Sequence, residues 1–243
     1  MKSLKTYTLG TVGVALTLLL GVSCTKSFDF KTPSDSNSVS GSTAQVFVAT
    51  VGAARNYVYV DSKLATGSLL ATGSLFPTTG YGFAVPAGSR ALLIRDTLST
   101  TTQPQLSFAQ TFQASKNYTV FVYDTITTIK QKTVETKIVV PADTTARIRF
   151  ANFVYNPTIT PAVDVVSFRT NAILFAGINV TDVTDFISYP SILTSDTLYI
   201  RETGTQNTLV KIVTGGLTPK RSYTVVYRGS YRGTKTASLF ANY

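Results

Sequence analysis

From Ala44 onward, apolar residues alternate with polar ones or stand in short continuous runs, and Gly, Pro, Asn and Asp separate the runs. Alternation with a period of two residues is the pattern of a half-buried β-strand. In the first half this pattern predicts strands at residues 45–51, 57–61, 81–85, 91–95, 105–112, 118–126 and 133–140. Short strands between frequent turns indicate a β-sandwich of immunoglobulin-like size.

The second half repeats this pattern. Residues 146–152 open it as residues 44–50 open the first half, and residues 219–227 match residues 115–123, which contain the same Tyr-Thr-Val sequence. Because the order and spacing of the strands are kept, two tandem copies of one domain are the simplest interpretation. We therefore predict an all-β protein with two immunoglobulin-like β-sandwich domains, at residues 44–141 and 142–243.

Several of these blocks resemble the exported bacterial repeat known as domain of unknown function 4397. The matching blocks are residues 146–152, 156–157 and 161–165 of the second copy, and residues 57–61, 85–88 and 116–120 of the first. The chain departs from that family in containing no His, and its second copy lacks the Pro-Ala-Gly turn. The resemblance implies exported, often lipid-anchored surface domains of Bacteroidetes-like bacteria, with no known activity and no catalytic residues.

The N-terminus has the three-part pattern of a secretory signal. Lys2 and Lys5 precede an uncharged apolar run at residues 9–22, which is shorter than the roughly 20 residues of a membrane-spanning helix. The run ends at Cys24, the only cysteine, directly after the small residue Ser23. This resembles a lipobox, although Gly21 stands where Leu is usual. The alternative is a spare thiol near an ordinary cleavage site.

We accordingly predict a lipoprotein signal peptide at residues 1–23, lipid on Cys24, and a flexible polar tether at residues 24–43. The protein is then expected to be anchored by lipid in the cell envelope, at the outer membrane, on either its periplasmic or its outer side. The chain is basic, with 22 Lys and Arg against 12 Asp and Glu. These charges are scattered, so we interpret most of them as solvated strand faces. They favour anionic envelope polymers or lipid over nucleic acid as a partner.

The residue inventory argues against catalysis. The chain has no His, which excludes His-dependent catalytic dyads and triads and imidazole metal sites. Acylation of Cys24 would remove thiolate chemistry. Glu occurs only at Glu135 and Glu202, so a hydrolytic carboxylate pair would depend on scattered Asp. We predict neither enzymatic activity nor a cofactor.

Three further groups of residues are candidate sites. Asp182 and Asp185, with Asn179 nearby, are a weak candidate for Ca²⁺, and a turn bonded to its own amides is the favoured interpretation. A shared aromatic surface for a sugar or a partner would come from Tyr57, Tyr59, Tyr81, Tyr155, Tyr189, Tyr227 and Tyr231; filling of cross-strand pairs is the alternative.

Four Asp-Thr pairs resemble the acceptor for O-glycosylation in Bacteroidetes-like bacteria. The candidate hydroxyls are Thr97, Thr125, Thr144 and Thr197. Asp that caps a turn is an equally good account of these pairs. The expected function is a non-enzymatic envelope lipoprotein that displays two sandwiches for binding or structural contact. The alternatives are a pilus or fibre subunit that exchanges a strand and a glycan-binding accessory of a nutrient-uptake system.

Overall fold

The computed structural model describes residues 41–78, 82–191 and 195–242. Cys24, the predicted signal peptide and Tyr81 lie outside this part of the chain, so the predictions made for them stay predictions. Every regular element in the described ranges is a β-strand. No helix in those ranges is long and apolar enough to cross a membrane.

The first half is a sandwich of two sheets. One sheet has the order β4-β1-β8-β9, with β5 also paired to β1, and the other has the order β3-β2-β6-β7. The strands are β1 (Gly41–Val48), β2 (Asn56–Val60), β3 (Lys63–Leu64), β4 (Leu75–Phe76), β5 (Phe83–Pro86), β6 (Gly88–Asp96), β7 (Leu106–Phe112), β8 (Asn117–Tyr123) and β9 (Lys130–Glu135). Strands β1 and β8 are parallel, whereas their other neighbours are antiparallel.

The second half has the same topology. Its sheets have the orders β13-β10-β16-β17 and β12-β11-β14-β15. The strands are β10 (Ala146–Tyr155), β11 (Val163–Ser167), β12 (Ile173–Ile178), β13 (Ile187–Tyr189), β14 (Asp196–Glu202), β15 (Thr208–Gly215), β16 (Ser222–Ser230) and β17 (Lys235–Ala241). Strands β10 and β16 are parallel, as β1 and β8 are. The all-β class and the two tandem sandwiches are confirmed, while the exact domain boundaries remain a prediction.

Some strand positions differ from the expected ones. Strand β1 begins at Gly41, inside the predicted tether, because residues 41–44 pair with β5. Ala44 pairs with Tyr118, and Ile148 pairs with Tyr223. Ile148, rather than Ala146, is therefore the counterpart of Ala44. A shift of two residues keeps each side chain on the same face of its strand, so the sequence pattern could not detect it.

Each sandwich has its own buried core. The first contains Val46, Val58, Leu92 and Val120, and the second is centred on a corresponding set of aliphatic and aromatic side chains. Both cores fill the space between the two sheets of a sandwich, which is where the inward residues of each strand point. The two-residue periodicity of the chain therefore predicts the cores well.

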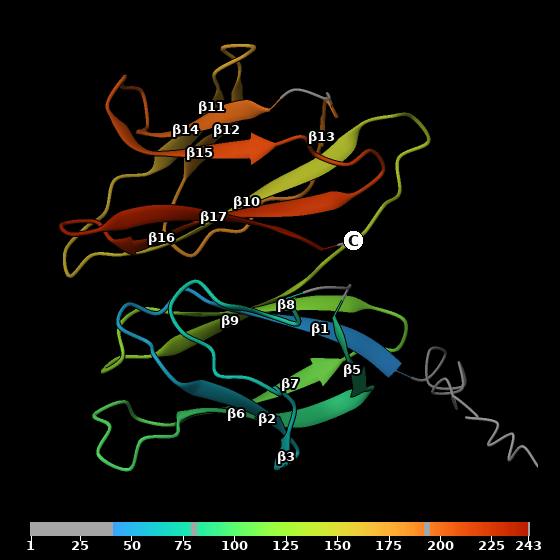
Figure 1. Ribbon diagram of the computed structural model, residues 1–243, viewed down its shortest axis with the longest axis vertical. Coiled ribbons are helices and arrows are strands. Elements are labelled where there is room, and N and C mark those ends of the chain that lie inside the picture. The colour runs from blue at the N-terminus through green and yellow to red at the C-terminus, as the bar shows by residue number, and fades with distance from the viewer. Residues whose placement is uncertain (1–40, 79–81, 192–194, 243) are drawn as a thin grey trace, which may run out of the picture. The chain divides into compact units, whose positions relative to one another are not determined.

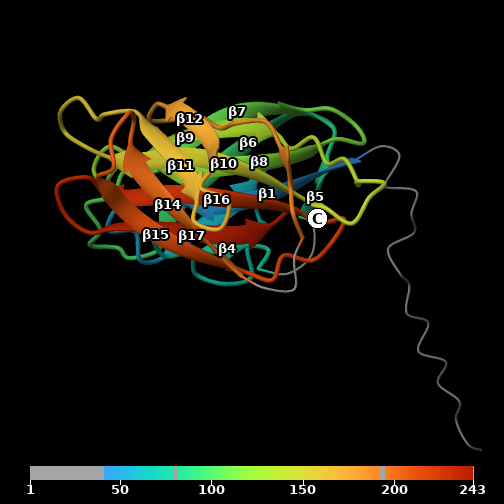
Figure 2. The ribbon, with the colours of Figure 1, turned by 90° about the horizontal axis from the view of Figure 1, so that it is seen from above.

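A third apolar cluster joins the two sandwiches. In Figure 1, the sheet of β1, β8 and β9 faces the sheet of β10, β16 and β17. Figure 2 views the molecule from above, with the strands of the two halves running in broadly similar directions. Phe47 stacks on Phe240 at 5.3 Å between ring centroids, and Phe121 stacks on Phe153 at 4.6 Å. The outer face of one sheet in each half is thus covered by the other half.

Polar side chains line one side of this contact. The Gln45 amide donates to the Ala241 carbonyl at 3.0 Å, and the Asn242 amide donates to the Gln45 side chain at 2.8 Å. The Thr224 hydroxyl donates to Asn242, and Arg149 Nε donates to Thr224 at 2.8 Å. The contact between the sandwiches therefore includes a continuous chain of buried hydrogen bonds.

Candidate functional site

The four candidate acceptor hydroxyls lie in different surroundings. Thr97 and Thr144 are exposed in loops, whereas Thr125 and Thr197 are half-buried. The Thr125 hydroxyl forms hydrogen bonds with the hydroxyls of Thr127 and Thr128. Thr197 is part of β14 and pairs with Val213. Access for a modifying enzyme is therefore best at Thr97 and Thr144.

The acidic partners of these threonines all cap local backbone. Asp96 accepts from the Leu98 amide at 2.8 Å, Asp124 from Thr125 at 2.9 Å, and Asp143 from Thr145 at 2.9 Å. Asp196 accepts from the amide of Thr197 at 2.6 Å. Turn capping is thus present at every pair. It does not exclude glycosylation, which stays a prediction.

The weak Ca²⁺ candidate has the geometry of a capped turn. The Asp182 carboxylate accepts from the Asn179 amide at 3.1 Å, and the Asp182 amide donates to the Asn179 carbonyl at 3.1 Å. In the described part of the chain, no three His, Cys, Asp or Glu side chains are grouped so that they could hold a metal ion. Nothing in the geometry brings Asp182 and Asp185 together as ligands.

The tyrosine candidates that the structure describes are dispersed. Among them, Tyr189 and Tyr227 are buried. Tyr59, on β2 of the first sandwich, has the Arg95 guanidinium 4.8 Å from its ring centroid. Tyr231 lies in the second sandwich, where its amide donates to the Tyr155 carbonyl at 2.8 Å. These side chains cannot form a single stacking platform.

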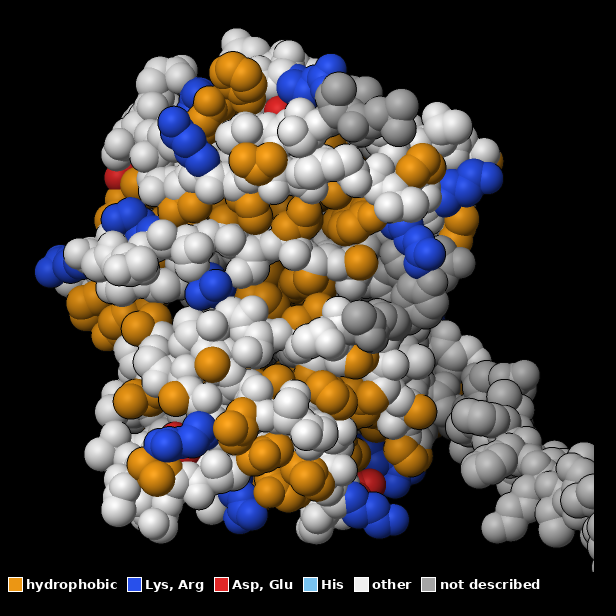
Figure 3. Space-filling model, in the orientation of Figure 1, with side chains coloured by type: hydrophobic (Ala, Val, Ile, Leu, Met, Phe, Trp, Pro, Cys, Tyr) orange, Lys and Arg blue, Asp and Glu red, His pale blue; other side chains and the backbone are white. Residues whose placement is uncertain are grey.

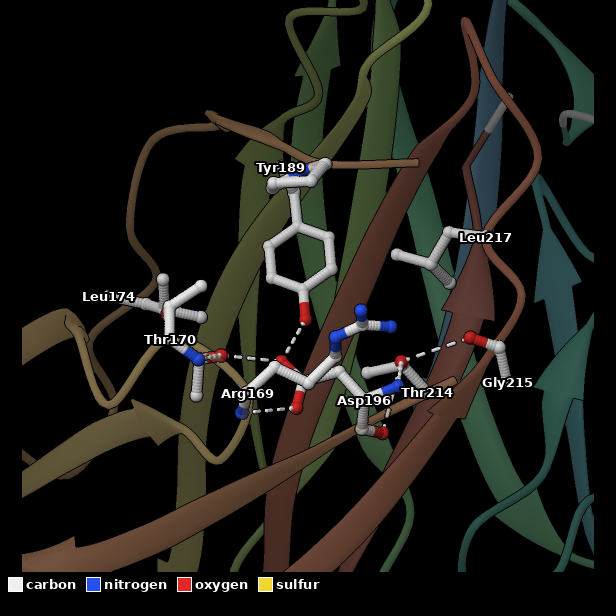
Figure 4. Close-up of a pocket in the computed structure, with 10 residues that line it drawn as sticks. Arg169, Thr170, Leu174, Tyr189, Asp196, Thr214, Gly215 and Leu217 are labelled. Atoms are coloured by element: carbon white, nitrogen blue, oxygen red, sulfur yellow. Dashed lines mark hydrogen bonds between the residues drawn. The ribbon is translucent and has the colours of Figure 1, made fainter. Parts of the chain in front are cut away.

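A small pocket at one edge of the second sandwich surrounds Asp196 (Figure 4). The Asp196 carboxylate accepts from the hydroxyls of Ser167 and Tyr189, both at 2.5 Å, and from the Arg169 amide at 3.0 Å. Burial alone would raise the pKa of Asp196, but these donors outweigh it and hold the pKa below its usual range. The cavity volume is about 40 Å³, enough for a few water molecules only. We interpret this pocket as a structural junction.

The outer face of the β12-β11-β14-β15 sheet carries exposed apolar side chains. Phe168 is 64% exposed, Ile173 60% and Val213 63%. The Phe168 amide donates to the Thr197 carbonyl at 2.9 Å, which holds Phe168 beside β14. Its ring meets Tyr199 edge-on, with 5.7 Å between the centroids. Scattered exposed apolar residues are common, but an aromatic pair with apolar neighbours on one sheet face is typical of a contact surface.

Two cations flank Tyr199 on this face. The Arg201 guanidinium lies 5.1 Å from the centroid of the ring, and the Lys211 ammonium lies 5.2 Å from it. Lys211 is directly opposite Tyr199 on β15, so both side chains leave the same face of the sheet. Such contacts contribute about 0.5–1 kcal/mol each at exposed sites. They place positive charge at the edge of the aromatic pair.

One carboxylate shares this face but is fully engaged. Asp164, opposite Arg201 on β11, accepts from the amides of Gly177 and Gly204 and from the Thr203 hydroxyl. Burial opposes ionisation, yet these bonds lower the pKa of Asp164 overall. Its negative charge is therefore stabilised by hydrogen-bond donors of its own sandwich. We call the surface formed by Phe168, Tyr199, Arg201, Lys211 and Val213 the aromatic-basic face.

This surface was not predicted from the sequence. Tyr199 and Phe168 were not singled out, although Leu198 and Ile200 alternate around Tyr199 as buried core residues. Alternation required Tyr199 to point outward. That signal was available from the sequence, but the adjacent position of Phe168 depends on the pairing of strands β11 and β14.

Comparisons with known proteins yield only distant likenesses. No family model matches the chain, and no curated protein matches it. The family 26 carbohydrate-binding module CBMbc of Eubacterium rectale Amy13K, solved with maltoheptaose, is 12% identical, with 81% of this chain and 95% of that chain covered and a TM-score of 0.28. A streptococcal virulence factor, solved in a study of alpha-glucan binding, is 9% identical, with 83% and 97% covered and a TM-score of 0.26. Likenesses this weak carry no argument about function.

Proposed function

We propose that the protein is a non-catalytic, lipid-anchored protein of the bacterial cell envelope that binds an anionic polysaccharide through its aromatic-basic face. The observation that carries this proposal is the exposed Phe168 ring against Tyr199, whose own ring has the Lys211 ammonium beside it. A sugar ring can pack its apolar face on an aromatic side chain. Lys and Arg next to that ring would attract the acidic groups of the polymer.

The shape of the surface suits an extended polymer. The face belongs to an antiparallel sheet whose strands β14 and β15 pair along most of their length, so its outward side chains form rows rather than a closed pocket. A binding site of this kind contacts several sugar units weakly instead of enclosing one. The sum of weak contacts along a polymer gives useful retention.

The chemistry of the described carboxylates also favours binding over catalysis. Asp164 and Asp196 are buried and accept several hydrogen bonds each from their own sandwich. Their pKa values are lowered, which suits a permanent structural anion better than a general acid near neutral pH.

The fibre-subunit alternative has no observation in its favour. Strand β17 is paired with β16 along its whole length, from Lys235 to Ala241. An exchangeable strand would have to leave this ladder. This pairing argues against that function.

The anchoring is tested through Cys24. In the native host, we expect wild-type protein in the membrane fraction and Cys24→Ala protein released from it, because a lipid-modified thiol is the proposed tether. Mass spectrometry of the native N-terminus should show a diacylglycerol-sized addition. An unmodified N-terminus at another residue would refute the anchor.

The binding is tested with the soluble form that begins at Thr25. Affinity electrophoresis through gels with acidic or neutral polysaccharides should show retardation by the acidic ones, and added salt should weaken it. Equal mobility in all gels would refute the proposed ligand class.

A further inference from the structure

A second feature with ligand-binding character lies away from the aromatic-basic face. A groove of about 880 Å³ opens beside the contact between the two sandwiches. The residues that matter for its chemistry are Glu135 and Lys137 from the first half and Arg147, Arg149, Asp185 and Phe186 from the second. Of these six side chains, three are basic and two are acidic.

Arg149 brings a buried guanidinium to this groove. The residue is 2% exposed. Its Nε donates to the Thr224 hydroxyl at 2.8 Å, and its Nη2 donates to Thr119 at 2.9 Å and to Thr136 at 3.1 Å. A guanidinium has five N–H donors. The two on Nη1 have no acceptor among the described residues, and the residue lines the groove.

The positive charge of Arg149 lacks a full counter-charge. No carboxylate of the described residues lies within ion-pair distance of it. Burial lowers the pKa of Arg149 to about 9, and the more distant Asp185 opposes this only in part. The Phe186 ring, 4.8 Å from the guanidinium carbon, adds a cation–π contact. Buried charges are normally paired, because an unpaired one is costly.

The rim of the groove adds further positive charge. Lys137 and Arg147 line it, while Glu135 is already paired with Lys116 at 3.0 Å. Asp185 is the remaining acidic group. The groove therefore presents three cations against one carboxylate that has no ion pair in the described structure.

We propose that this groove binds a carboxylate, which supplies the missing counter-charge to Nη1 of Arg149. Lys137 and Arg147 hold the ligand at the rim, and Phe186 offers an apolar surface to the body of the ligand. The carboxylate can belong to an acidic sugar or to a peptide, since the groove chemistry is the same for both. The groove does not depend on the aromatic-basic face, so either site can be refuted alone.

Calorimetric titration of the soluble form beginning at Thr25 tests the proposal. The probes are trigalacturonate, a triglutamate peptide and neutral maltotriose. We expect at least one carboxylate probe to bind and maltotriose not to bind. Lys137→Gln and Arg147→Gln should each weaken that binding about fivefold or more. Lys63→Gln, the same change of an exposed lysine on β3 of the first sandwich, lies outside both proposed sites, is the matched control and should leave the binding unchanged.

Side-chain ¹⁵N NMR separates ligand binding from a purely structural role of Arg149. The bound carboxylate should shift the Arg149 guanidinium resonances, whereas a residue that only joins the sandwiches would show no response to ligand. Binding of only one carboxylate probe, weakened by Lys137→Gln and Arg147→Gln, supports the proposal and identifies the source. Failure of both probes to bind, equal weakening by Lys63→Gln, or unmoved Arg149 resonances would overturn it.

Discussion

The Nη2 atom of Arg149 lies 2.9 Å from the hydroxyl oxygen of Thr119, so a buried cation of the second sandwich is held by the first. The strand register makes Gln45 the counterpart of Arg149, because Gln45 pairs with Thr119 and Arg149 pairs with Thr224. Gln45 likewise reaches across to the second sandwich. Each half therefore uses the same face of the same sheet, as in the self-complementary interface of a symmetric dimer.

Substitution of Arg149 should reveal how much this contact stabilises the protein. Arg149→Ala removes three hydrogen bonds and leaves a cavity, so we expect the free energy of unfolding to fall by about 3 kcal/mol. Arg149→Met fills most of the space. Thr119 and Thr136 keep their mutual bond at 2.7 Å, and the expected loss is about 1 kcal/mol. Urea denaturation at pH 7 measures both.

Arg147→Ala is the control for these variants, because Arg147 is only half-buried and its loss should change stability by less than about 0.5 kcal/mol. Because both variants lose the Arg149 hydrogen bonds, their difference reports the cavity, and an Arg149→Met variant as destabilised as Arg149→Ala, or more so, would contradict the cavity account.

Separated halves should fold but remain complementary. Fragments 41–141 and 142–243 each keep a core between their own two sheets, so we expect β-rich circular dichroism spectra from both. Each fragment would expose rings that are stacked in the intact chain, such as Phe121 and Phe153. A mixture should therefore form a 1:1 complex in sedimentation experiments. Halves that are helical or unfolded alone would contradict the domain boundaries, and halves that never associate would contradict the apolar contact.

In the native host, glycosylation should occur at the more exposed of the candidate threonines. We expect Thr144 to be modified first and Thr97 next, because both are exposed loop residues that a transferase can reach. Thr197 should stay unmodified, since it belongs to β14 and is half-buried. Peptide mapping of host-derived protein decides the matter through hexose-scale mass increments. Unmodified Thr97 and Thr144 peptides would leave turn capping as the whole explanation of the Asp-Thr pairs.

Much of the fold was predictable from alternation alone. The tandem sandwiches and most strands follow from the two-residue period, since inward residues such as Val58 and Leu198 are buried as expected. The two-residue strands β3 and β4 were not predicted, because so short a segment has no period to detect. Their existence depends on pairing with longer strands.

The contact between the sandwiches could be predicted only in part. Continuous apolar runs around Phe47 and Phe121 indicate strands buried on both faces, which is what the structure has. The alternation places Arg149 and Thr224 on outward positions, where solvent is the usual neighbour. The alternation does not reveal that another sheet covers these two residues, because their covering depends on how two complete sandwiches pack together.

The surface chemistry also limits what the sequence can predict. On the face in Figure 3, Lys and Arg side chains are spread over both halves without one dominant cluster, as the scattered basic residues suggested. Net charge alone therefore did not locate a site. The aromatic-basic face depends on cross-strand neighbours, which become known only with the register of β14 and β15.

The most direct test of the central claim is affinity electrophoresis of Phe168→Ser in acidic polysaccharide. Ile159→Ser, which removes a 95% exposed apolar side chain elsewhere on the second half, is the matched control. We predict that Phe168→Ser loses most of the retardation, by about fivefold or more in the dissociation constant, while Ile159→Ser moves as the wild type does. Equal retardation of wild type, Phe168→Ser and Ile159→Ser would contradict the proposal that the aromatic-basic face binds the polymer.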